Sequence, residues 1–326
     1  MATSWLEGRH VLVAGGSGFV GTNLIRRLLE LGATVRATLH ERPSQLTEGR
    51  IEYIRADLTS TEDCQSVMRD IEVVFMCAAS TSGAAVIRDN PLVHVTPNVV
   101  MNARTLEAAY HAGVAKFVWL SSNAAYPPTG RRPVREEELF AGEPYDAYFP
   151  VAWMKRYTEV LCRMFSEKLP VRMPVVVVRP SNLYGPYDDF DPRTSHVTAA
   201  LVRKVVERSA PIEVWGDGHD IRDILYIDDF IDGLLLAAER LDGYDPVNIG
   251  LGQAFSVREI LAMLLELEGY SNAELRFDAS KPSMIPVRLI DVDKARTRLG
   301  FSPQVDPREG LRRTLAWYRA SRVPGG

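Results

Sequence analysis

Three glycines near the N-terminus, Gly15, Gly18 and Gly21, have the spacing of a phosphate-binding turn. An apolar run at residues 11–14 precedes them, and apolar residues recur with helical periodicity over residues 24–29. Glycine permits a tight turn and lets the backbone approach a pyrophosphate, which then lies at the N-terminus of the helix. The sequence therefore predicts a dinucleotide site with Phe19 and Val20 beside it, and an ordinary strand-to-helix turn is the alternative.

The end of the second predicted strand, residues 34–39, bears on which dinucleotide binds. Proteins that prefer NAD carry an acidic residue at this point for the ribose hydroxyls. This chain has Leu39 there, and the basic residues His40 and Arg42 follow closely. Basic groups without the acid favour the 2′-phosphate of NADP. We expect NADP, with NAD as the alternative, and with solvated loop side chains as the plainer interpretation of His40 and Arg42.

Strands and helices must alternate to place these residues at one edge of a sheet. Further strands are expected at residues 51–56, 73–76, 117–120 and 175–178, and helices at 98–112 and 150–168. This alternation predicts an α/β fold with a doubly wound parallel sheet. Asp57 and Leu58, after the third strand, are placed to meet the adenine. The small residues Ala78 and Ala79, after the fourth strand, either let the chain pass close to a cofactor or pack the end of the strand.

A second, smaller domain is expected in the later part of the chain. Residues 179–196 are rich in Pro, Asp and Ser, and the regular alternation of the first half ends there. Helices are predicted at 195–208, 228–241, 256–268 and 307–321, and short strands at 212–215, 224–227 and around Leu275. We expect residues 181–221 and 251–326 to bind substrate, interleaved with a dinucleotide-binding domain of residues 1–180 and 222–250.

Composition excludes several other classes of function. A net charge of −4 without a basic run argues against nucleic acid as a partner. No apolar segment reaches the length that spans a membrane, and the first residues do not resemble a signal peptide. Neither the three cysteines nor the six histidines have metal-ligand spacing, so no metal is expected. Three unclustered cysteines suit a reducing compartment, and we expect a cytoplasmic protein.

Longer motifs resemble one known family over nearly the whole chain. They are the glycine turn, the helix that contains Lys155, SSNAAYP at 121–127, RPSNLYGP at 179–186 and WGDGHDIRDILYIDD at 215–229. These resemble the extended short-chain dehydrogenase/reductases, the epimerases and dehydratases of nucleotide-activated sugars. TSH at 194–196 and DASKP at 278–282 resemble the subgroup of GDP-4-keto-6-deoxymannose 3,5-epimerase-4-reductases. The resemblance implies a Rossmann fold, a homodimer, a nicotinamide cofactor and a GDP-linked sugar as substrate.

The resemblance also implies roles for individual residues. Ser122 corresponds to the catalytic Ser or Thr of the family, and His196 to an acid that the subgroup uses for epimerisation. Lys155 corresponds to the lysine that lowers the pKa of a catalytic tyrosine and holds the nicotinamide ribose, and Asn98 to the asparagine that supports this lysine. The residues that correspond to ligands of the nucleotide diphosphate and sugar are Asn182, Arg203, Trp215, Arg222 and Lys281.

Two positions depart from the family pattern, and both carry chemistry. Val151 stands four residues before Lys155, where the family has the tyrosine that relays a proton as hydride moves. Ala124 stands where the subgroup has a cysteine base. Tyr148, or less favourably Tyr145, could supply a phenol from the segment before the helix, and Ser122 with bound water could serve a different reaction.

Three functions therefore stay open. The leading hypothesis is an NADP-dependent epimerase or reductase of a GDP-linked 4-keto-6-deoxy hexose with atypical active-site chemistry. The second is a non-catalytic protein that binds NADP and a sugar nucleotide, or that partners an active paralogue. The third is a reductase of a carbonyl compound without a nucleotide, which the segment VRATLHERP at 35–43 favours and the DASKP and TSH segments oppose.

Overall fold

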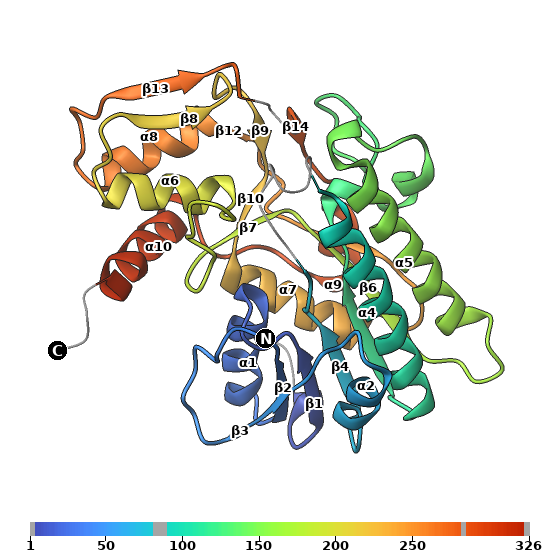
Figure 1. The fold of residues 1–326 in the computed structure, drawn as a ribbon. Helices are drawn as coiled ribbons and strands as arrows, with labels where there is room; N and C mark the ends of the chain where they lie inside the picture. Colours follow the sequence, from blue (N-terminus) through green and yellow to red (C-terminus); the bar gives the residue numbers. More distant parts are fainter. Residues whose placement is uncertain (1–3, 81–89, 282–284, 323–326) are drawn as a thin grey trace.

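A seven-stranded parallel sheet forms the centre of the molecule, in a computed structural model that describes residues 4–80, 90–281 and 285–322 (Figure 1). The strand order is β11-β6-β5-β4-β1-β2-β3, and every neighbouring pair is parallel. This order reverses direction between β1 and β4, as in a Rossmann fold, and confirms the predicted fold class. The strands are β1 His10–Ala14, β2 Thr34–Leu39, β3 Ile51–Arg55, β4 Val73–Met76, β5 Lys116–Leu120, β6 Val175–Pro180 and β11 Val247–Ile249.

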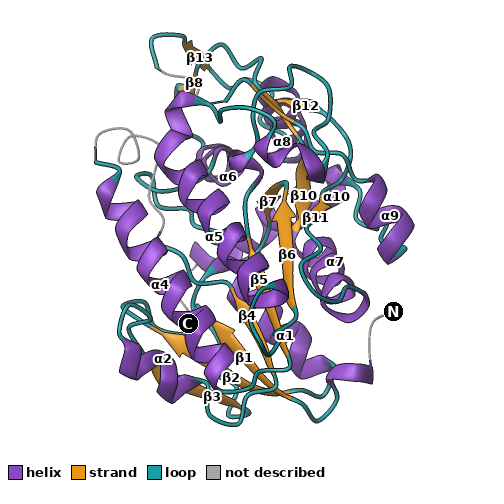
Figure 2. Cartoon of the chain, turned by 90° about the vertical axis from the view of Figure 1, so that its right-hand side faces the viewer, coloured by secondary structure: helices purple, strands orange, loops and turns teal. Residues whose placement is uncertain are grey.

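Both faces of the sheet are buried, which explains the apolar strands. In β1, Val11 and Val13 pack into one hydrophobic cluster, whereas Leu12 and Ala14 pack into another on the opposite face. Figure 2 shows helices on both sides of the sheet. Helices α1 (Phe19–Glu30) and α7 (Ile227–Arg240) pack on each other, and α2 (Thr61–Val67), α4 (Leu92–His111) and α5 (Phe149–Glu167) form the second layer.

Most of the remaining elements lie beyond the carboxyl ends of the strands, above the sheet in Figure 1. Three helices pack on one another there, α6 (Val197–Val206), α8 (Val257–Leu267) and α10 (Pro307–Arg322), while α9 (Asp293–Leu299) packs on α7. Three small sheets accompany them: β7 (Asn182–Tyr184) with β10 (Ile224–Tyr226), β8 (Ile212–Trp215) with β13 (Leu275–Asp278), and β9 (Ile221–Arg222) between β12 (Phe255–Ser256) and β14 (Val287–Arg288). The stated limits of the two domains stay a prediction.

Helix α4 begins six residues before the predicted start at residue 98. The predicted start was wrong, and Pro97, the residue before it, lies inside α4. Proline has no N–H to offer the carbonyl four residues earlier, which is that of Val93. The Ser80 hydroxyl donates to this carbonyl instead, at 3.2 Å. A side chain from the segment after β4 thus completes the helix and ties it to that segment.

The other predicted elements are present, with ends that differ by one or two residues. The short helices α2 and α9 and the short strands β7, β9, β11, β12 and β14 were not predicted, because two to seven residues carry too little periodicity. Four 3₁₀ turns complete the described chain: η1 Ser4–Leu6, η2 Asn123–Ala125, η3 Glu136–Phe140 and η4 Asp146–Tyr148. Among the described helices, none combines the length and apolar character needed to cross a bilayer.

Candidate functional site

The glycine turn is packed so closely that side chains would fill it. A Cβ on Gly21 would lie 2.1 Å from the carbonyl oxygen of Gly15, and one on Gly15 would lie 2.7 Å from the backbone of Ala78. Gly15 also has a φ of +86°, which favours glycine. The side chain of Thr38 accepts a hydrogen bond from the Gly15 amide at 2.9 Å. The turn is therefore fixed between β1, β2 and the segment after β4.

The start of α1 suits a pyrophosphate. Gly18 is the N-cap and has no side chain to accept hydrogen bonds from the first helical turn, which contains Phe19 and Val20. The first amides of a helix, together with the helix dipole, attract a phosphate group. The assignment of Gly15, Gly18, Gly21, Ala78 and Ala79 to a dinucleotide stays a prediction, and the close packing of this turn is compatible with it.

A groove of about 320 Å³ continues from the ends of β2 and β3. Its lining residues are His40, Glu41, Arg55, Ala56, Asp57 and Asp63. The Thr59 hydroxyl and amide both donate to the Asp57 carboxylate and lower its pKa. Leu58 is buried beside Asp57. The groove contains two of the residues predicted at the adenosine end, His40 and Asp57, and adds a basic residue that was not predicted, Arg55.

Arg42 lies outside the lining of this groove. Its guanidinium is 3.7 Å from the carboxylate of Asp189, which belongs to the loop after β7. The Arg42 side chain keeps 67% of its exposure, so this ion pair is weak. A phosphate at the ribose 2′ position would compete with Asp189 for the same cation.

Lys155 and Ser122 lie on two adjacent elements, α5 and the segment after β5. The Lys155 ammonium donates to the carbonyl of Leu120 at 2.9 Å and lies 4.6 Å from the centre of the Trp119 ring. Burial lowers the pKa of Lys155 to about 8, against the opposing charge of Glu159. The Ser122 hydroxyl accepts from the amide of Ala124 at 3.1 Å. The lysine thus bonds to the last residue of β5, and the serine follows two residues later.

Asn98 makes different contacts from those that the resemblance implied. Its amide nitrogen donates to the carbonyls of Ser80 and His94, and its amide oxygen accepts from the backbone of Ser80. These bonds fix the segment after β4 against α4. Direct support of Lys155 is not among the described contacts of Asn98, so that role stays a prediction.

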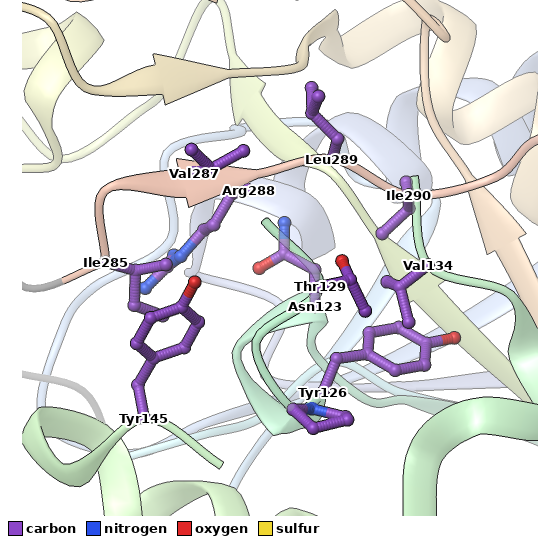
Figure 3. A pocket seen from close by; sticks show the side chains of 11 residues that line it. Asn123, Tyr126, Thr129, Val134, Tyr145, Ile285, Val287, Arg288, Leu289 and Ile290 are labelled. Carbon is purple, nitrogen blue, oxygen red and sulfur yellow. The ribbon is translucent and has the colours of Figure 1, made fainter. Parts of the chain in front are cut away.

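Two tyrosines and two arginines form a cluster near the segment that follows β5. They are Tyr145, Tyr148, Arg222 and Arg288. The guanidinium carbon of Arg288 lies 4.7 Å from the ring centre of Tyr148. Figure 3 shows Arg288 and Tyr145 pointing toward one another across a cavity of about 20 Å³, which is room for one water molecule. Asn123, the neighbour of Ser122, lines the same cavity.

The charges of this cluster favour an anion. Arg222 is buried and pairs with Asp220 at 3.0 Å, and burial followed by the nearby charge of Arg288 lowers its pKa. Within the described residues, the Nε atom of Arg288 is buried without a hydrogen-bond partner. Two neighbouring guanidinium groups, of which Arg222 is paired with one carboxylate, are suited to bind a diphosphate.

His196 lies near the same cluster, at the N-terminal end of α6. His196 is an exposed residue, and protein atoms nevertheless surround its imidazole. Desolvation by these atoms, followed by the charge of Arg288, lowers the pKa of His196, and Asp189 opposes them. The imidazole is therefore neutral near pH 7 and can exchange a proton.

The other predicted substrate residues fall into two groups. Asn182 and Arg203 are held by protein contacts: the Asn182 amide donates to the carbonyl of Asp223 at 3.0 Å, and Arg203 lies 3.6 Å from Glu207. Trp215 and Lys281 lie together by the small β8–β13 sheet, with the ammonium 5.8 Å from the indole centre. Trp215 is half exposed, which leaves a ring face for stacking.

Comparison with known proteins agrees with this geometry. The sequence model of the NAD dependent epimerase/dehydratase family matches residues 11–250. The chain belongs to this family. The chain is also 30% identical to GDP-L-fucose synthase 1 of Arabidopsis thaliana over 94% of this chain and 92% of the relative, and 30% identical to the GDP-L-fucose synthase of Escherichia coli K12 over 95% and 96%. A solved UDP-glucose 4-epimerase of Thermotoga maritima, 26% identical, superposes with a TM-score of 0.86 over 96% of this chain and 99% of that one.

As a member of the epimerase/dehydratase family, the chain is a nicotinamide-dependent enzyme. It departs from the expected family pattern at two positions. Val151 lies in the first turn of α5 and Lys155 one turn later, so valine occupies the helix position expected for the tyrosine. Ala124 is buried in the turn after Ser122. No phenol or thiol stands at these two positions.

Several residues of the site were not predicted from the sequence. Arg288 belongs to a two-residue strand that lies outside the recognised motifs, and Arg55 ends a strand as an isolated basic residue. The one sequence signal for Arg55 and Arg288 as site residues is a basic residue directly after apolar strand residues. This pattern is common in proteins. In the described ranges, no three His, Cys, Asp or Glu side chains gather as metal ligands would.

Proposed function

We propose that the protein is an NADP-dependent epimerase/reductase of a GDP-linked 4-keto-6-deoxy hexose, with atypical active-site chemistry. The observation that carries the proposal is the neighbouring pair Arg222 and Arg288, of which Arg288 lines a cavity together with Asn123, the residue after Ser122. This arrangement would hold a sugar diphosphate beside Lys155, at the edge of the sheet where the glycine cradle lies. The Leu39, His40 and Arg42 sequence supports NADP over NAD.

Each residue then has a definite task. The bound cofactor supplies a hydride, while Lys155 holds its ribose through a charged donor. Ser122 donates to the sugar carbonyl oxygen, which draws electron density from the neighbouring carbons. His196, neutral near pH 7, exchanges a proton with a carbon next to the carbonyl. Tyr148 is our candidate for the proton on the sugar oxygen, because it lies seven residues, about two turns, before Lys155.

Val151 and Ala124 favour a second candidate, a non-catalytic protein that binds NADP and a sugar nucleotide or partners an active paralogue. Neither side chain can give or take a proton. The retained Ser122, Lys155, His196 and Arg222 favour catalysis, because a binding protein has less need of all four.

One experiment separates these candidates. The parent protein and Val151→Tyr are incubated with NADPH and GDP-4-keto-6-deoxymannose in deuterated water, following absorbance at the NADPH band and deuterium uptake. We expect slow NADPH oxidation by the parent and at least about tenfold faster oxidation by Val151→Tyr, since a positioned general acid contributes about 10²–10⁴-fold. Lys155→Met is the inactive control.

The outcomes discriminate clearly. Deuterium uptake without oxidation indicates epimerisation alone. No reaction by either protein, together with thermal stabilisation by NADPH and the sugar nucleotide, supports the binding protein. Failure to bind NADPH contradicts both candidates. A parallel titration with GDP and UDP tests which nucleotide the protein prefers. The two relatives named above are GDP-L-fucose synthases, whereas the solved epimerase was determined with UDP-glucose.

We also propose that the protein is a homodimer through α5. A stripe of large apolar residues runs along its exposed face, at spacings of four, four and three residues. Its members are Phe149 (48% exposed), Trp153 (37%), Tyr157 (50%) and Val160 (52%). Such a contiguous stripe is typical of a protein interface.

A further inference from the structure

A buried cluster of polar side chains lies beneath Ser122 and Lys155. At its centre is Glu159 of α5, which is fully buried and pairs with Arg179 of β6, which is 1% exposed. The Arg179 Nε donates to Glu159 Oε1 at 2.9 Å, and Nη2 donates to Oε2 at 2.5 Å. A bidentate pair of this kind has fixed geometry, and loss of one partner leaves an uncompensated buried charge.

The pair reaches the end of β5 through Ser121. The Ser121 hydroxyl donates to Glu159 Oε1 at 2.6 Å, and Ser122 is the next residue. One turn earlier on the same helix face, Lys155 donates to the carbonyl of Leu120. Helix α5 therefore holds two successive residues of the chain, one through its lysine and one through its glutamate.

The same network holds the chain on the other side of Ser122. Arg179 Nη1 donates to the Tyr126 hydroxyl at 2.7 Å, and this hydroxyl donates to Asn248 Oδ1 at 2.7 Å. Ser122 thus lies in a short segment with a fixed point at Ser121 and another at Tyr126. Both fixed points depend on the Glu159–Arg179 pair.

We propose that Glu159 is a positioning residue, which holds Ser122 against Lys155 through its hydrogen bond with Ser121. The role rests on the proposed function, because Ser122 and Lys155 define it. Glu159 touches neither substrate nor cofactor. It acts by fixing where the serine hydroxyl and the lysine ammonium stand relative to each other.

Glu159 also affects the charge of Lys155. Burial lowers the pKa of this ammonium to about 8, and the Glu159 carboxylate is the main opposing charge. The other groups that face it are the Cys162 thiol, from the same helix, and the Trp119 ring of β5. Arg179 and Tyr244 lie beyond Glu159. Removing the carboxylate would therefore lower the pKa of Lys155 further and leave Arg179 as a second nearby cation.

The test compares three variants of the full chain. Ser121→Ala removes the bond to β5 without burying a charge, and Glu159→Gln keeps the shape but removes the carboxylate charge. Tyr244→Phe is the matched control, because the Tyr244 hydroxyl donates to the other carboxylate oxygen of Glu159 at 3.3 Å, and its removal leaves the Ser121 hydroxyl in place. We measure thermal stability, NADPH affinity by fluorescence, and the acetylation rate of Lys155 against pH in the cofactor-free protein by peptide mass spectrometry, with exposed Lys168 as the internal reference.

We expect Ser121→Ala to weaken NADPH binding about fivefold while Tyr244→Phe stays within about twofold. Both hydroxyls donate to the Glu159 carboxylate, but the Ser121 bond is the shorter one, 2.6 Å against 3.3 Å, and it links Glu159 to the residue before Ser122. In Glu159→Gln, Lys155 should be acetylated about tenfold faster at pH 7, because its titration moves to lower pH. Equal effects of Ser121→Ala and Tyr244→Phe, or an unchanged Lys155 profile in folded Glu159→Gln, would overturn the proposal.

An unfolded variant, a failure of the proposed function and a failure of the role proposed for Glu159 can be told apart. If Glu159→Gln does not fold, the comparison of Ser121→Ala with Tyr244→Phe decides by itself. If the parent protein does not bind NADPH, the proposed function fails. The Lys155 profiles of the parent and Glu159→Gln, measured without cofactor, then still decide the role of Glu159.

Discussion

A substitution at Gly18 should weaken cofactor binding without changing the stability of the fold. A Cβ there would lie 3.4 Å from the Gly15 oxygen, an ordinary contact, and its φ of −81° suits any residue. Gly18→Ala should therefore keep its melting temperature within about 2 °C while its methyl enters the phosphate cradle. We expect NADPH binding to weaken about tenfold or more, equivalent to ~1.4 kcal/mol, in a fluorescence titration.

Two further glycines control this experiment. Gly49→Ala should change neither property, because nothing lies within 4 Å of its Cβ position. Gly21→Ala should lose stability as well as binding, since its Cβ would meet the Gly15 carbonyl at 2.1 Å. Parent-like NADPH affinity in Gly18→Ala would contradict a phosphate at this helix end.

At the scale of elements, α5 serves the site with one face and exposes an apolar stripe on another. Tyr157→Asp, in the middle of the stripe, should convert the expected dimer to a monomer, because a charge would be buried in the interface. Analytical ultracentrifugation at several protein concentrations measures the change. Leu275→Asp on β13 is the control, since Leu275 is 41% exposed but lies on the small β8–β13 sheet. A monomeric parent protein would refute the dimer.

At the scale of the whole molecule, the ion pair of Arg42 with Asp189 joins the cofactor end to the loop after β7. Arg42→Ala should weaken NADPH binding about tenfold and leave NADH binding nearly unchanged, because only NADPH carries the 2′-phosphate. Asp189→Asn should strengthen NADPH binding by freeing Arg42. Isothermal titration with both cofactors gives the ratio.

Arg50→Ala controls for the general charge of the β2–β3 loop, because Arg50 pairs with Glu48 in the same loop. An equal loss of NADPH and NADH binding in Arg42→Ala would remove Arg42 from cofactor selection. In that case Arg55, in the groove at the ends of β2 and β3, becomes the residue to change.

The parts of the site that could be predicted are those encoded by neighbours in the sequence. The glycine turn lies within one strand–turn–helix unit, and the place of Val151 follows from a four-residue helical spacing. The Arg288–Tyr148 contact and the Glu159–Arg179 pair join residues 140 and 20 positions apart, through elements whose packing no local pattern specifies. The predicted start of α4 was wrong for a related reason. The Ser80 hydroxyl, from outside the helix, donates to the Val93 carbonyl, which Pro97 cannot do.

The proposed cofactor cradle and the proposed diphosphate cluster come from separate stretches of chain, and Val151 lies in neither. Because of this separation, catalytic turnover and ligand binding can change independently of each other during evolution. A lineage that loses the phenol at the start of α5 keeps an intact receptor for both ligands, on which selection can act for regulation or for new chemistry. The same separation makes the loss reversible, since one residue at the first turn of α5 restores the missing group while the rest of the pocket has been maintained.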